Sequence, residues 1–374
     1  MSFLRGLQKR WNGARRRCKI YKYVKLREKV MNVVYYSSDF FSQICGVAIQ
    51  SLCESNINEE EIIVYVIEDN ISELNKKRMK TITDKYNRKL IFIKMPTQEE
   101  VYPEAKIDLG RTYARMALGE ILPKSVDRVL SLDSDTLVVD SLHDMYNTQF
   151  HDGEYVAGVY DCVGKAMQNK VLHGPKDMCY CNAGMFLIDL DKWRAENVGK
   201  KLLNAVMENA DGKHIMYFLE QDLMNLVFYG HLKVLNPRYN MITSVYYFEY
   251  NEVVKMKQPV VYYNSEEVEF AKKKPAIFHA TTCFYIEKRM WVEKSDHPYS
   301  RLYQEYRKKT PWKDEPQIQD MRNRRKKMYA KFWKIIPRKI AIILATYMIN
   351  YFRPFYAWYT AKARITTIAK QSET

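Results

Sequence analysis

The 374-residue chain lacks the features that mark several common classes of protein. Its seven cysteines are odd in number and irregularly spaced, which predicts reduced thiols rather than a disulfide framework. No apolar run reaches the roughly 20 residues of a membrane-spanning helix, and the basic N-terminus has no apolar stretch typical of a secretory signal. No internal repeat or low-complexity linker interrupts the chain. Because 47% of the residues are hydrophobic, we expect one large core with appendages.

The middle of the chain has no excess of positive charge, although the whole chain carries +16. Residues 1–30 have a net charge of +10 and residues 321–374 of +12, which leaves 31–320 at −6. A domain with this negative net charge would repel the phosphate backbone of a nucleic acid. We therefore expect no nucleic-acid partner.

Both basic ends also carry apolar side chains. At the N-terminus these share one helical face, formed by Phe3, Leu4, Leu7 and Trp11. Near the C-terminus, the apolar run 340–349 precedes an aromatic cluster. Such segments predict basic amphipathic helical extensions lying in the headgroup region of an anionic membrane, where each Lys or Arg contributes about 1 kcal/mol. The expected location is the cytoplasmic face of the plasma membrane, with the protein bound peripherally. The alternative is that the C-terminal helices pack on the body or on another subunit.

Between the ends, strand-like and helix-like segments alternate. Strands are expected at 31–36, 62–67, 90–93, 128–133, 155–159 and 185–188, and helices at 41–55, 72–86 and 111–122. This order predicts an α/β fold with a mostly parallel, Rossmann-like sheet flanked by helices. In such sheets, ligands collect where the strands end.

Two carboxylates, Asp133 and Asp135, follow the fourth expected strand. Side chains alternate along an extended chain, so both would point the same way, with Ser134 opposed. Converging oxygen ligands suit a hard divalent cation such as Mg²⁺ or Mn²⁺, which neutralises phosphate groups. The simplest alternative is an Asx-rich turn after a strand.

A series of motifs over residues 31–315 resembles glycosyltransferase family 8, the retaining nucleotide-sugar transferases of GT-A fold. In chain order the motifs are VVYYSSD at 33–39, RTYAR at 111–115, RVLSLDSD at 128–135, CNAGMFLI at 181–188, EQD at 220–222 with Asn225, NPRYN at 236–240 and KPAIFH at 274–279. The tail of the bacterial cell-surface polysaccharide branch is resembled by Trp291, by HPY at 297–299 and by TPW at 310–312. The resemblance implies a GT-A domain at 31–315 between an N-terminal extension, 1–30, and a membrane-associating segment, 316–374.

The resemblance also implies a metal site and a donor site. Mn²⁺, or Mg²⁺, would be bound by Asp133, Asp135 and His279, and an imidazole among oxygen ligands favours Mn²⁺. The implied donor contacts are Tyr36, Ser38, Asp39, Arg115, Asp133, Ser134, Asn182, Ala183 and Gly184. The implied phosphate contact is Lys288 or Arg289, and the sequence does not choose between them.

Glu220, Gln221 and Asp222 would lie across the transferred sugar, by the same resemblance. Because a glutamine is a poor nucleophile, the favoured mechanism is front-face attack by the acceptor, with a phosphate oxygen taking its proton. The Gln221 carbonyl would then stabilise positive charge on the anomeric carbon. A covalent intermediate on Glu220 or Asp222 is the alternative.

The expected function is transfer of glucose or galactose from UDP-glucose or UDP-galactose to a saccharide acceptor, a lipid-linked glycan of a bacterial cell surface. Two other classes stay open. A haloacid-dehalogenase-type phosphatase would use Asp133 as its nucleophile, but Leu137 stands where it would want Thr or Val. A non-catalytic membrane-binding or polyanion-binding protein would explain the ends, but neither the paired aspartates nor His279.

Overall fold

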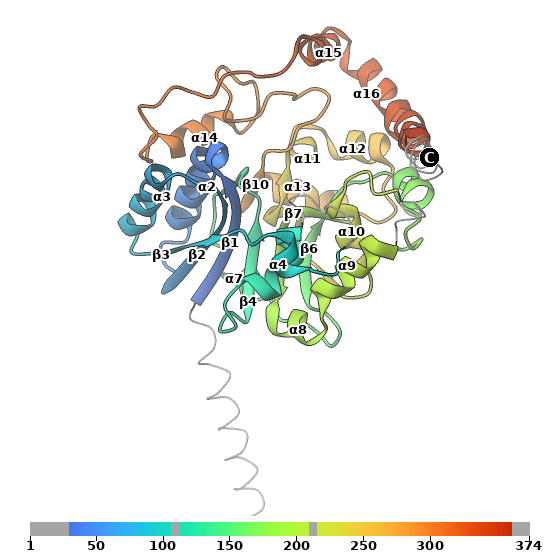
Figure 1. Cartoon of the computed structure of the whole chain (residues 1–374). Helices are drawn as coiled ribbons and strands as arrows, with labels where there is room; N and C mark the ends of the chain where they lie inside the picture. The colour runs from blue at the N-terminus through green and yellow to red at the C-terminus, as the bar shows by residue number, and fades with distance from the viewer. Residues whose placement is uncertain (1–29, 106–112, 209–214, 361–374) are drawn as a thin grey trace, which may run out of the picture.

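The computed structural model describes residues 30–105, 113–208 and 215–360, so residues 1–29 of the predicted extension at 1–30 lie outside the described residues (Figure 1). A seven-stranded sheet forms the centre of the described part. In spatial order its strands are β3 (Lys89–Lys94), β2 (Glu61–Asp69), β1 (Val30–Ser38), β4 (Arg128–Leu132), β7 (Cys181–Asp189), β6 (Val156–Tyr160) and β8 (Leu232–Val234). β7 is antiparallel to both of its neighbours, and every other neighbouring pair is parallel. The predicted mostly parallel sheet is confirmed.

Helices cover both faces of this sheet because both faces are apolar. Along β1, Val33 and Tyr35 join one buried cluster with α2 (Ser42–Ser55) and α3 (Glu73–Lys85), while Val34 joins a second cluster with α9 (Val198–Glu208) and α10 (Glu220–Val227). This alternation is what the two-residue period of a strand requires. The helices before the C-terminal segment are α2 (Ser42–Ser55), α3 (Glu73–Lys85), α4 (Gln98–Val101), α5 (Tyr113–Met116), α6 (Leu118–Ile121), α7 (His143–Tyr146), α8 (Leu190–Ala195), α9 (Val198–Glu208), α10 (Glu220–Val227), α11 (Thr243–Tyr247), α12 (Tyr250–Lys257), α13 (Ser265–Lys273) and α14 (Ser300–Arg307). Short 3-10 or π turns lie at η1 (Asp39–Phe41), η3 (Met167–Val171) and η5 (Pro237–Tyr239).

A second, smaller sheet carries His279 to the paired aspartates. It contains β5 (Thr136–Val138), β10 (Ile277–His279) and β9 (Met241–Ile242). β10 is antiparallel to β5 with His279 opposite Thr136, so β10 ends beside the start of β5. The strand that carries His279 therefore belongs to this second sheet and not to the main one.

The expected helix at 111–122 differs from the structure. Within its described part, two short helices, α5 and α6, replace one continuous helix. Ala117 separates them with φ −95° and ψ 20°, and the second ends at Leu122, whose extended backbone precedes a proline. The other expected strands and helices are present within two residues of their expected bounds, apart from the start of β7.

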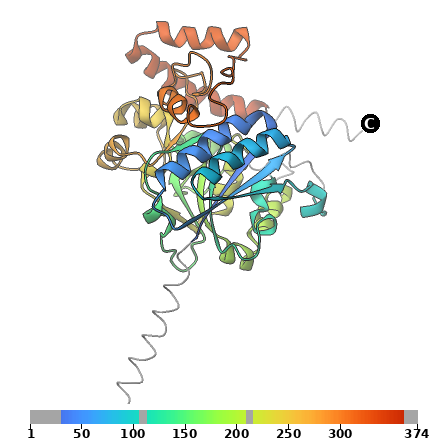
Figure 2. The same ribbon diagram turned by 90° about the vertical axis from the view of Figure 1, so that its left-hand side faces the viewer.

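The C-terminal segment lies over the side of the domain where β1 ends (Figure 2). It contains α15 (Arg324–Ile335), α16 (Arg338–Tyr347) and η6 (Met348–Phe352), with Pro337 between the first two helices. One face packs on the body: Trp333 is buried against Phe284, and α16 contacts α12. Among the described residues, no helix is both long and apolar enough to cross a bilayer.

Candidate active site

Asp133, Ser134 and Asp135 form a tight turn between β4 and β5, rather than the extended chain that the sequence analysis assumed. The Thr136 backbone N–H and hydroxyl both donate to the Asp133 carbonyl, at 3.2 and 2.8 Å, and close the turn. The Ser134 hydroxyl donates to the Tyr36 carbonyl at 2.7 Å, which ties the turn to the end of β1. The simplest alternative, an Asp-rich turn, is therefore present. It nevertheless brings both carboxylates together.

His279 meets both carboxylates. Its Nε2 lies 3.2 Å from Asp135 Oδ1 and 3.7 Å from Asp133 Oδ2. Its Nδ1 lies 3.0 Å from Asn240 Oδ1, and the Asn240 amide nitrogen donates to Asn182 Oδ1 at 3.0 Å. Since that second bond turns the Asn240 oxygen toward the ring, Nδ1–H is the donor. In the neutral ring, Nε2 would then carry the lone pair and offer it to a metal ion held by the two carboxylates.

These three side chains fit a divalent cation. One ligand atom from each of Asp133, Asp135 and His279 lies within 4.8 Å of the other two. A metal-binding histidine normally donates its second N–H to a neighbouring acceptor, as His279 does to Asn240. Two carboxylates and one imidazole suit Mn²⁺ better than Mg²⁺.

The charges of this cluster depend on one another. Burial disfavours protonation of His279, but the carboxylates of Asp135 and Asp133 outweigh it, so the pKa of His279 is raised. Burial likewise opposes ionisation of Asp135, but the positive charges of His279 and Arg289 outweigh it and lower its pKa. A cation bound between the carboxylates would supply the same compensation without a proton.

Gly184 makes room for the imidazole. A Cβ at this position would lie 2.1 Å from His279 Cε1 and 2.6 Å from Nδ1. Gly184 was expected to contact the donor, and the structure places the metal-site histidine against it. The Gly184 carbonyl also accepts a hydrogen bond from Asp133 N at 2.9 Å.

Arg115 connects the turn to α10. Its guanidinium donates to the Ala183 carbonyl at 2.8 Å and to Asp133 Oδ1 at 2.5 Å, and pairs with Glu220 at 3.2 Å. Burial lowers its pKa, but Asp133 and Glu220 outweigh that effect and keep it positive. The guanidinium also lies 5.1 Å from the centre of the Tyr36 ring.

The structure distinguishes the two candidate phosphate contacts. Arg289 reaches the metal cluster, because it donates to Asp135 Oδ2 at 2.8 Å and to the Ala280 carbonyl at 2.7 Å. Lys288 donates instead to the carbonyl of Lys294 at 3.0 Å, on the exposed surface. The geometry therefore favours Arg289.

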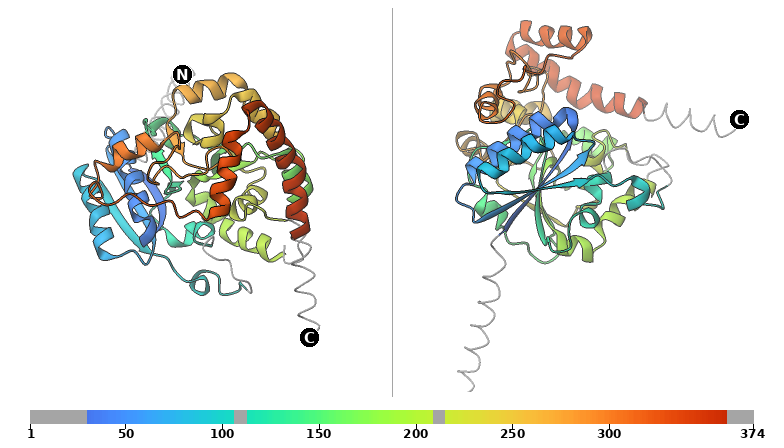
Figure 3. Two further views of the ribbon diagram at one scale, coloured as in Figure 1. Left: turned by 90° about the horizontal axis from the view of Figure 1, so that it is seen from above. Right: turned by 60° about the vertical axis from the view of Figure 1, so that its left-hand side comes forward.

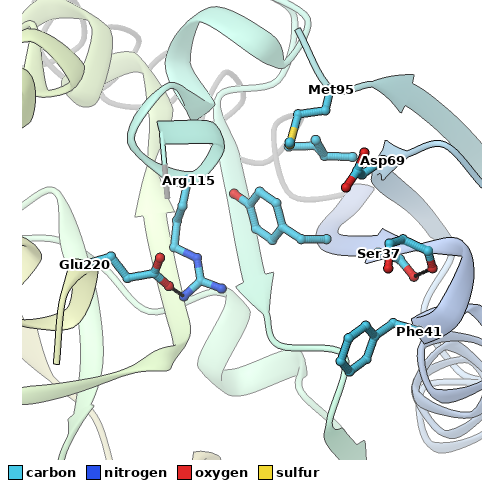
Figure 4. Close-up of a pocket in the computed structure, with 9 residues that line it drawn as sticks. Ser37, Phe41, Asp69, Met95, Arg115 and Glu220 are labelled. Carbon is cyan, nitrogen blue, oxygen red and sulfur yellow. Dashed lines mark hydrogen bonds and ion pairs between the residues drawn. The ribbon is translucent and has the colours of Figure 1, made fainter. Parts of the chain in front are cut away.

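A cavity of about 240 Å³ lies beside Arg115 and Glu220. Figure 4 shows these two residues facing each other on one side of it, with Ser37, Asp69 and Met95 across from them. Tyr36 and Ser38, both expected donor contacts, line the cavity. Asp69 was missed by the sequence analysis, although it ends β2 at the same sheet edge.

Asp39, another expected donor contact, does not line this cavity. Its Oδ1 accepts hydrogen bonds from the Ser72 backbone N–H and hydroxyl, and from Asn75 Nδ2, at 2.7–2.8 Å. The bond from the Ser72 backbone N–H contributes most to a lowered pKa of Asp39. Its carboxylate therefore binds the N-terminus of α3.

A larger cavity of about 540 Å³ lies on the other side of α10. Glu220 lines the smaller cavity, and the next residue, Gln221, lines the larger one. The Gln221 carbonyl accepts from Ala183 N at 3.0 Å and from Asn182 Nδ2 at 3.1 Å. The first turn of α10 therefore stands at the boundary between the two cavities.

Asp161 is a second residue that the sequence analysis missed. Its Oδ2 accepts hydrogen bonds from Asn182 Nδ2 and Gln221 Nε2, both at 3.1 Å, and it lines the larger cavity. Asp161 directly follows β6, which runs parallel to the other strands whose ends form the site. The strand-end rule that selected Asp133 could have selected it too.

Asp222 lines neither cavity. Its Oδ1 accepts from the Tyr180 hydroxyl at 2.5 Å and its Oδ2 from Phe218 N at 2.6 Å. Burial raises the pKa of Asp222 to about 6. Oδ2 therefore holds the segment before α10, where Leu219 has φ +49°, while Oδ1 binds Tyr180 just before β7. This geometry favours a structural role over covalent catalysis.

Comparison with known proteins identifies the family of this site. Residues 32–281 match the profile of "Glycosyl transferase family 8". The chain belongs to glycosyl transferase family 8. It is 24% identical over 288 residues to General stress protein A of Bacillus subtilis (strain 168), covering 76% of this chain and 96% of that protein. It is 25% identical over 231 residues to the lipopolysaccharide 1,2-glucosyltransferase of Escherichia coli, covering 59% of this chain and 66% of that protein.

Solved structures of other glycosyltransferases have the same fold. The galactosyltransferase LgtC, in complex with donor and acceptor sugar analogs, matches with a TM-score of 0.61 at 22% identity, covering 76% of this chain and 99% of that one. The WbbM bifunctional glycosyltransferase matches with a TM-score of 0.62 at 21% identity, covering 76% of this chain. This chain spans about half, 50%, of the length of WbbM. The family 8 glycosyltransferase described here has the GT-A fold that was predicted.

Proposed function

We propose that this family 8 enzyme is a metal-dependent, retaining hexosyltransferase that uses UDP-glucose or UDP-galactose. The observation that carries the proposal is the convergence of Asp133, Asp135 and His279 beside Arg115, with a separate cavity on each side of the first turn of α10. Two cavities that meet at one polar turn suit a donor and an acceptor. The E. coli glucosyltransferase relative supports a hexose as the transferred group.

The smaller cavity suits the nucleoside part of the donor. Its lining combines the ring of Tyr36 with polar groups of Ser37, Ser38 and Asp69. The diphosphate would then extend toward Asp133 and Asp135. Mn²⁺ held there, as a Lewis acid, would stabilise the negative charge that develops on the leaving UDP.

The protein's own charges act on the same leaving group. Arg289 lies at Asp135 and would contact a phosphate oxygen through its remaining N–H donors. Arg115 holds Asp133 and Glu220 in place, and so fixes the metal ligand and the donor-facing acid relative to each other. Glu220 would bind hydroxyl groups of the transferred sugar.

The acceptor would enter the larger cavity and attack the anomeric carbon from the side on which UDP leaves, so the configuration at that carbon would be retained. A phosphate oxygen of the departing UDP would take the acceptor proton. Gln221 and Asp161 face that cavity and would flank the reacting centre. Their partial and full negative charges would stabilise positive charge on the anomeric carbon. The role of the Gln221 carbonyl stays a prediction, since it now accepts two hydrogen bonds.

Membrane association is part of the same proposal. The C-terminal segment from 321 to 360 contains ten Lys or Arg residues and no acid. Its exposed aromatic residues would insert at the headgroup level of an anionic cytoplasmic leaflet. There the enzyme would meet a lipid-linked saccharide acceptor.

The test is a UDP-release assay with a panel of UDP-sugars, with and without Mn²⁺. The proposal predicts Mn²⁺-dependent UDP release from UDP-glucose or UDP-galactose, and NMR of a transfer product should show the donor's α-configuration. Release of inorganic phosphate would instead support the phosphatase alternative. No turnover of any UDP-sugar would support the non-catalytic alternative.

A further inference from the structure

The larger cavity does not end at the body of the enzyme. It begins at Asp161, Asn182 and Gln221, and its far wall is formed by α15, α16 and η6, including Trp333 and Phe352. The C-terminal segment is therefore part of the proposed acceptor site, in addition to any role at a membrane.

A second hollow continues from that wall. It has a volume of about 560 Å³ and lies between α15 and the stretch formed by α16, η6 and the helical turns that follow. The two hollows share Trp333, Met348 and Phe352. A molecule whose reacting group lies at Gln221 could thus continue past these side chains into the second hollow.

The second hollow, here called the apolar groove, differs chemically from the cavity beside it. All eight residues that line it are aliphatic or aromatic, among them Phe332, Leu344, Tyr351 and Phe355. The cavity at Gln221 is lined by charged, amide and hydroxyl groups at its inner end. Together they suit an amphiphile with a polar head inside and a hydrocarbon chain outside.

The surroundings of the groove indicate which class of molecule covers it. Sixteen of the 25 exposed large hydrophobic residues of the described chain lie between 321 and 359, a region that forms a layer on one side of the body (Figure 3). Ten basic and no acidic residues lie in the same stretch, 321–360. A second copy of the chain would bring two such positive faces together, which Coulomb repulsion disfavours. An anionic lipid surface complements both the charge and the exposed aromatic residues.

We infer that the apolar groove binds the hydrocarbon chain of the acceptor while its saccharide lies at Gln221. This inference rests on the proposed function and adds a chemical requirement to it: the acceptor is a glycolipid, and the enzyme recognises its chain as well as its sugar. The hydrocarbon chain of the acceptor runs from the membrane through the apolar groove and reaches the acceptor cavity between Trp333 and Phe352. The C-terminal helices thereby join the membrane surface to the reaction centre.

The test measures binding of methyl, hexyl and octyl β-D-glucoside to the full chain by calorimetry, below the critical micelle concentration and without membranes. Burial of a methylene in a half-open groove raises affinity about two- to fourfold. Octyl glucoside should therefore bind about four- to fifteenfold more tightly than hexyl glucoside. Methyl glucoside should bind most weakly.

A matched pair of variants tests whether the alkyl chain of the glucoside binds in the apolar groove. Leu344→Glu places a charge in the groove, while Ile343→Glu places the same charge on the neighbouring residue, which lines neither hollow. The two side chains are similarly exposed, at 39% and 47%. We expect Leu344→Glu to abolish the chain-length dependence and Ile343→Glu to keep it. A second groove variant, Tyr351→Glu, should behave like Leu344→Glu. It replaces Leu344→Glu in the comparison if the Leu344→Glu protein does not fold.

Three results would overturn the inference. The chain-length dependence could be absent from the wild type, it could be lost equally in both variants at positions 343 and 344, or it could survive both groove substitutions. Light scattering tests whether the groove instead binds a second copy of the protein. That would be the conclusion if the wild type were a dimer, Leu344→Glu were a monomer, and binding of the alkyl glucosides were the same in both. Acceptor-independent UDP release is measured in parallel, so failure of the proposed function is seen separately.

Discussion

Replacing Gly184 by alanine tests whether His279 is a metal ligand without removing any ligand atom. The new Cβ would lie 2.1 Å from His279 Cε1, so the ring must move by about 1.3 Å to reach the 3.4 Å of an ordinary contact. His279 is only 4% exposed, and its Nδ1 is held 3.0 Å from Asn240. The ring has no open space to move into without breaking that bond or turning Nε2 away from the two carboxylates.

The expected loss is large in metal affinity and moderate in stability. Loss of the hydrogen-bond partner of a metal-bound histidine lowers metal affinity by about 10–100-fold. Displacing the histidine itself should therefore lower Mn²⁺ affinity by at least about 100-fold. Overpacking should lower the free energy of unfolding by about 1–3 kcal/mol. The assays are Mn²⁺ titration monitored by electron paramagnetic resonance, and thermal unfolding in EDTA and in Mn²⁺.

Gly119→Ala is the control for overpacking. Its Cβ would lie 2.8 Å from Trp193 Cδ1, beside α8. Because α8 follows the antiparallel strand β7, it lies at the opposite end of the domain from the metal cluster (Figure 1). The control should lose stability but keep wild-type Mn²⁺ affinity. If folded Gly184→Ala protein bound Mn²⁺ as tightly as the wild type, the assignment of His279 would be refuted.

Three further predictions concern the metal, the pH dependence and the C-terminal surface. Asp135→Asn should reduce Mn²⁺-dependent UDP release by at least about 100-fold, and activity within a few-fold of wild type would count against this ligand. Burial lowers the pKa of His297 from 6.5 to about 4. The unfolded chain therefore takes up the proton first, and the free energy of unfolding should fall by roughly 3 kcal/mol between pH 6.5 and 4. The free energy of unfolding of His297→Asn, measured by denaturation across that range, should depend less on pH. An unchanged pH dependence would show that His297 is not its cause. Replacing the exposed Tyr351, Phe355 and Tyr359 together by serine should weaken sedimentation with anionic liposomes without lowering the melting temperature, whereas unchanged sedimentation would favour packing on protein.

The positions of the main strands along the chain could be predicted from the sequence because each strand is a short apolar run that ends in polar residues. That pattern gave the position of Asp133 and the sheet edge on which ligands gather. It did not give the turn that brings Asp133 and Asp135 together, since the period of a strand applies only until the strand ends. The carboxylates converge because Thr136 closes the turn on the Asp133 carbonyl.

Other parts of the site depend on contacts between distant segments, which a local pattern does not contain. β10 pairs with the three-residue strand β5, too short to be recognised by alternation, and this pairing sets His279 beside Asp135. The family resemblance implied Asp39 as a donor contact, but the N-terminus of α3 binds its carboxylate. The same strand-end rule applied to β6 would have found Asp161. Only the described structure distinguishes Arg289 from Lys288, because neighbouring residues point to different surroundings.

The central claim is that Asp133, Asp135 and His279 hold one metal ion at the donor site. Pulsed electron paramagnetic resonance of the protein with Mn²⁺ and UDP tests it most directly, because a coordinated imidazole adds a nitrogen coupling to the manganese signal. We predict that this coupling is present in the wild type and absent from His279→Gln, along with phosphorus couplings from UDP in the wild type. A bound manganese ion without nitrogen coupling, or with a coupling that survives His279→Gln, would contradict the account.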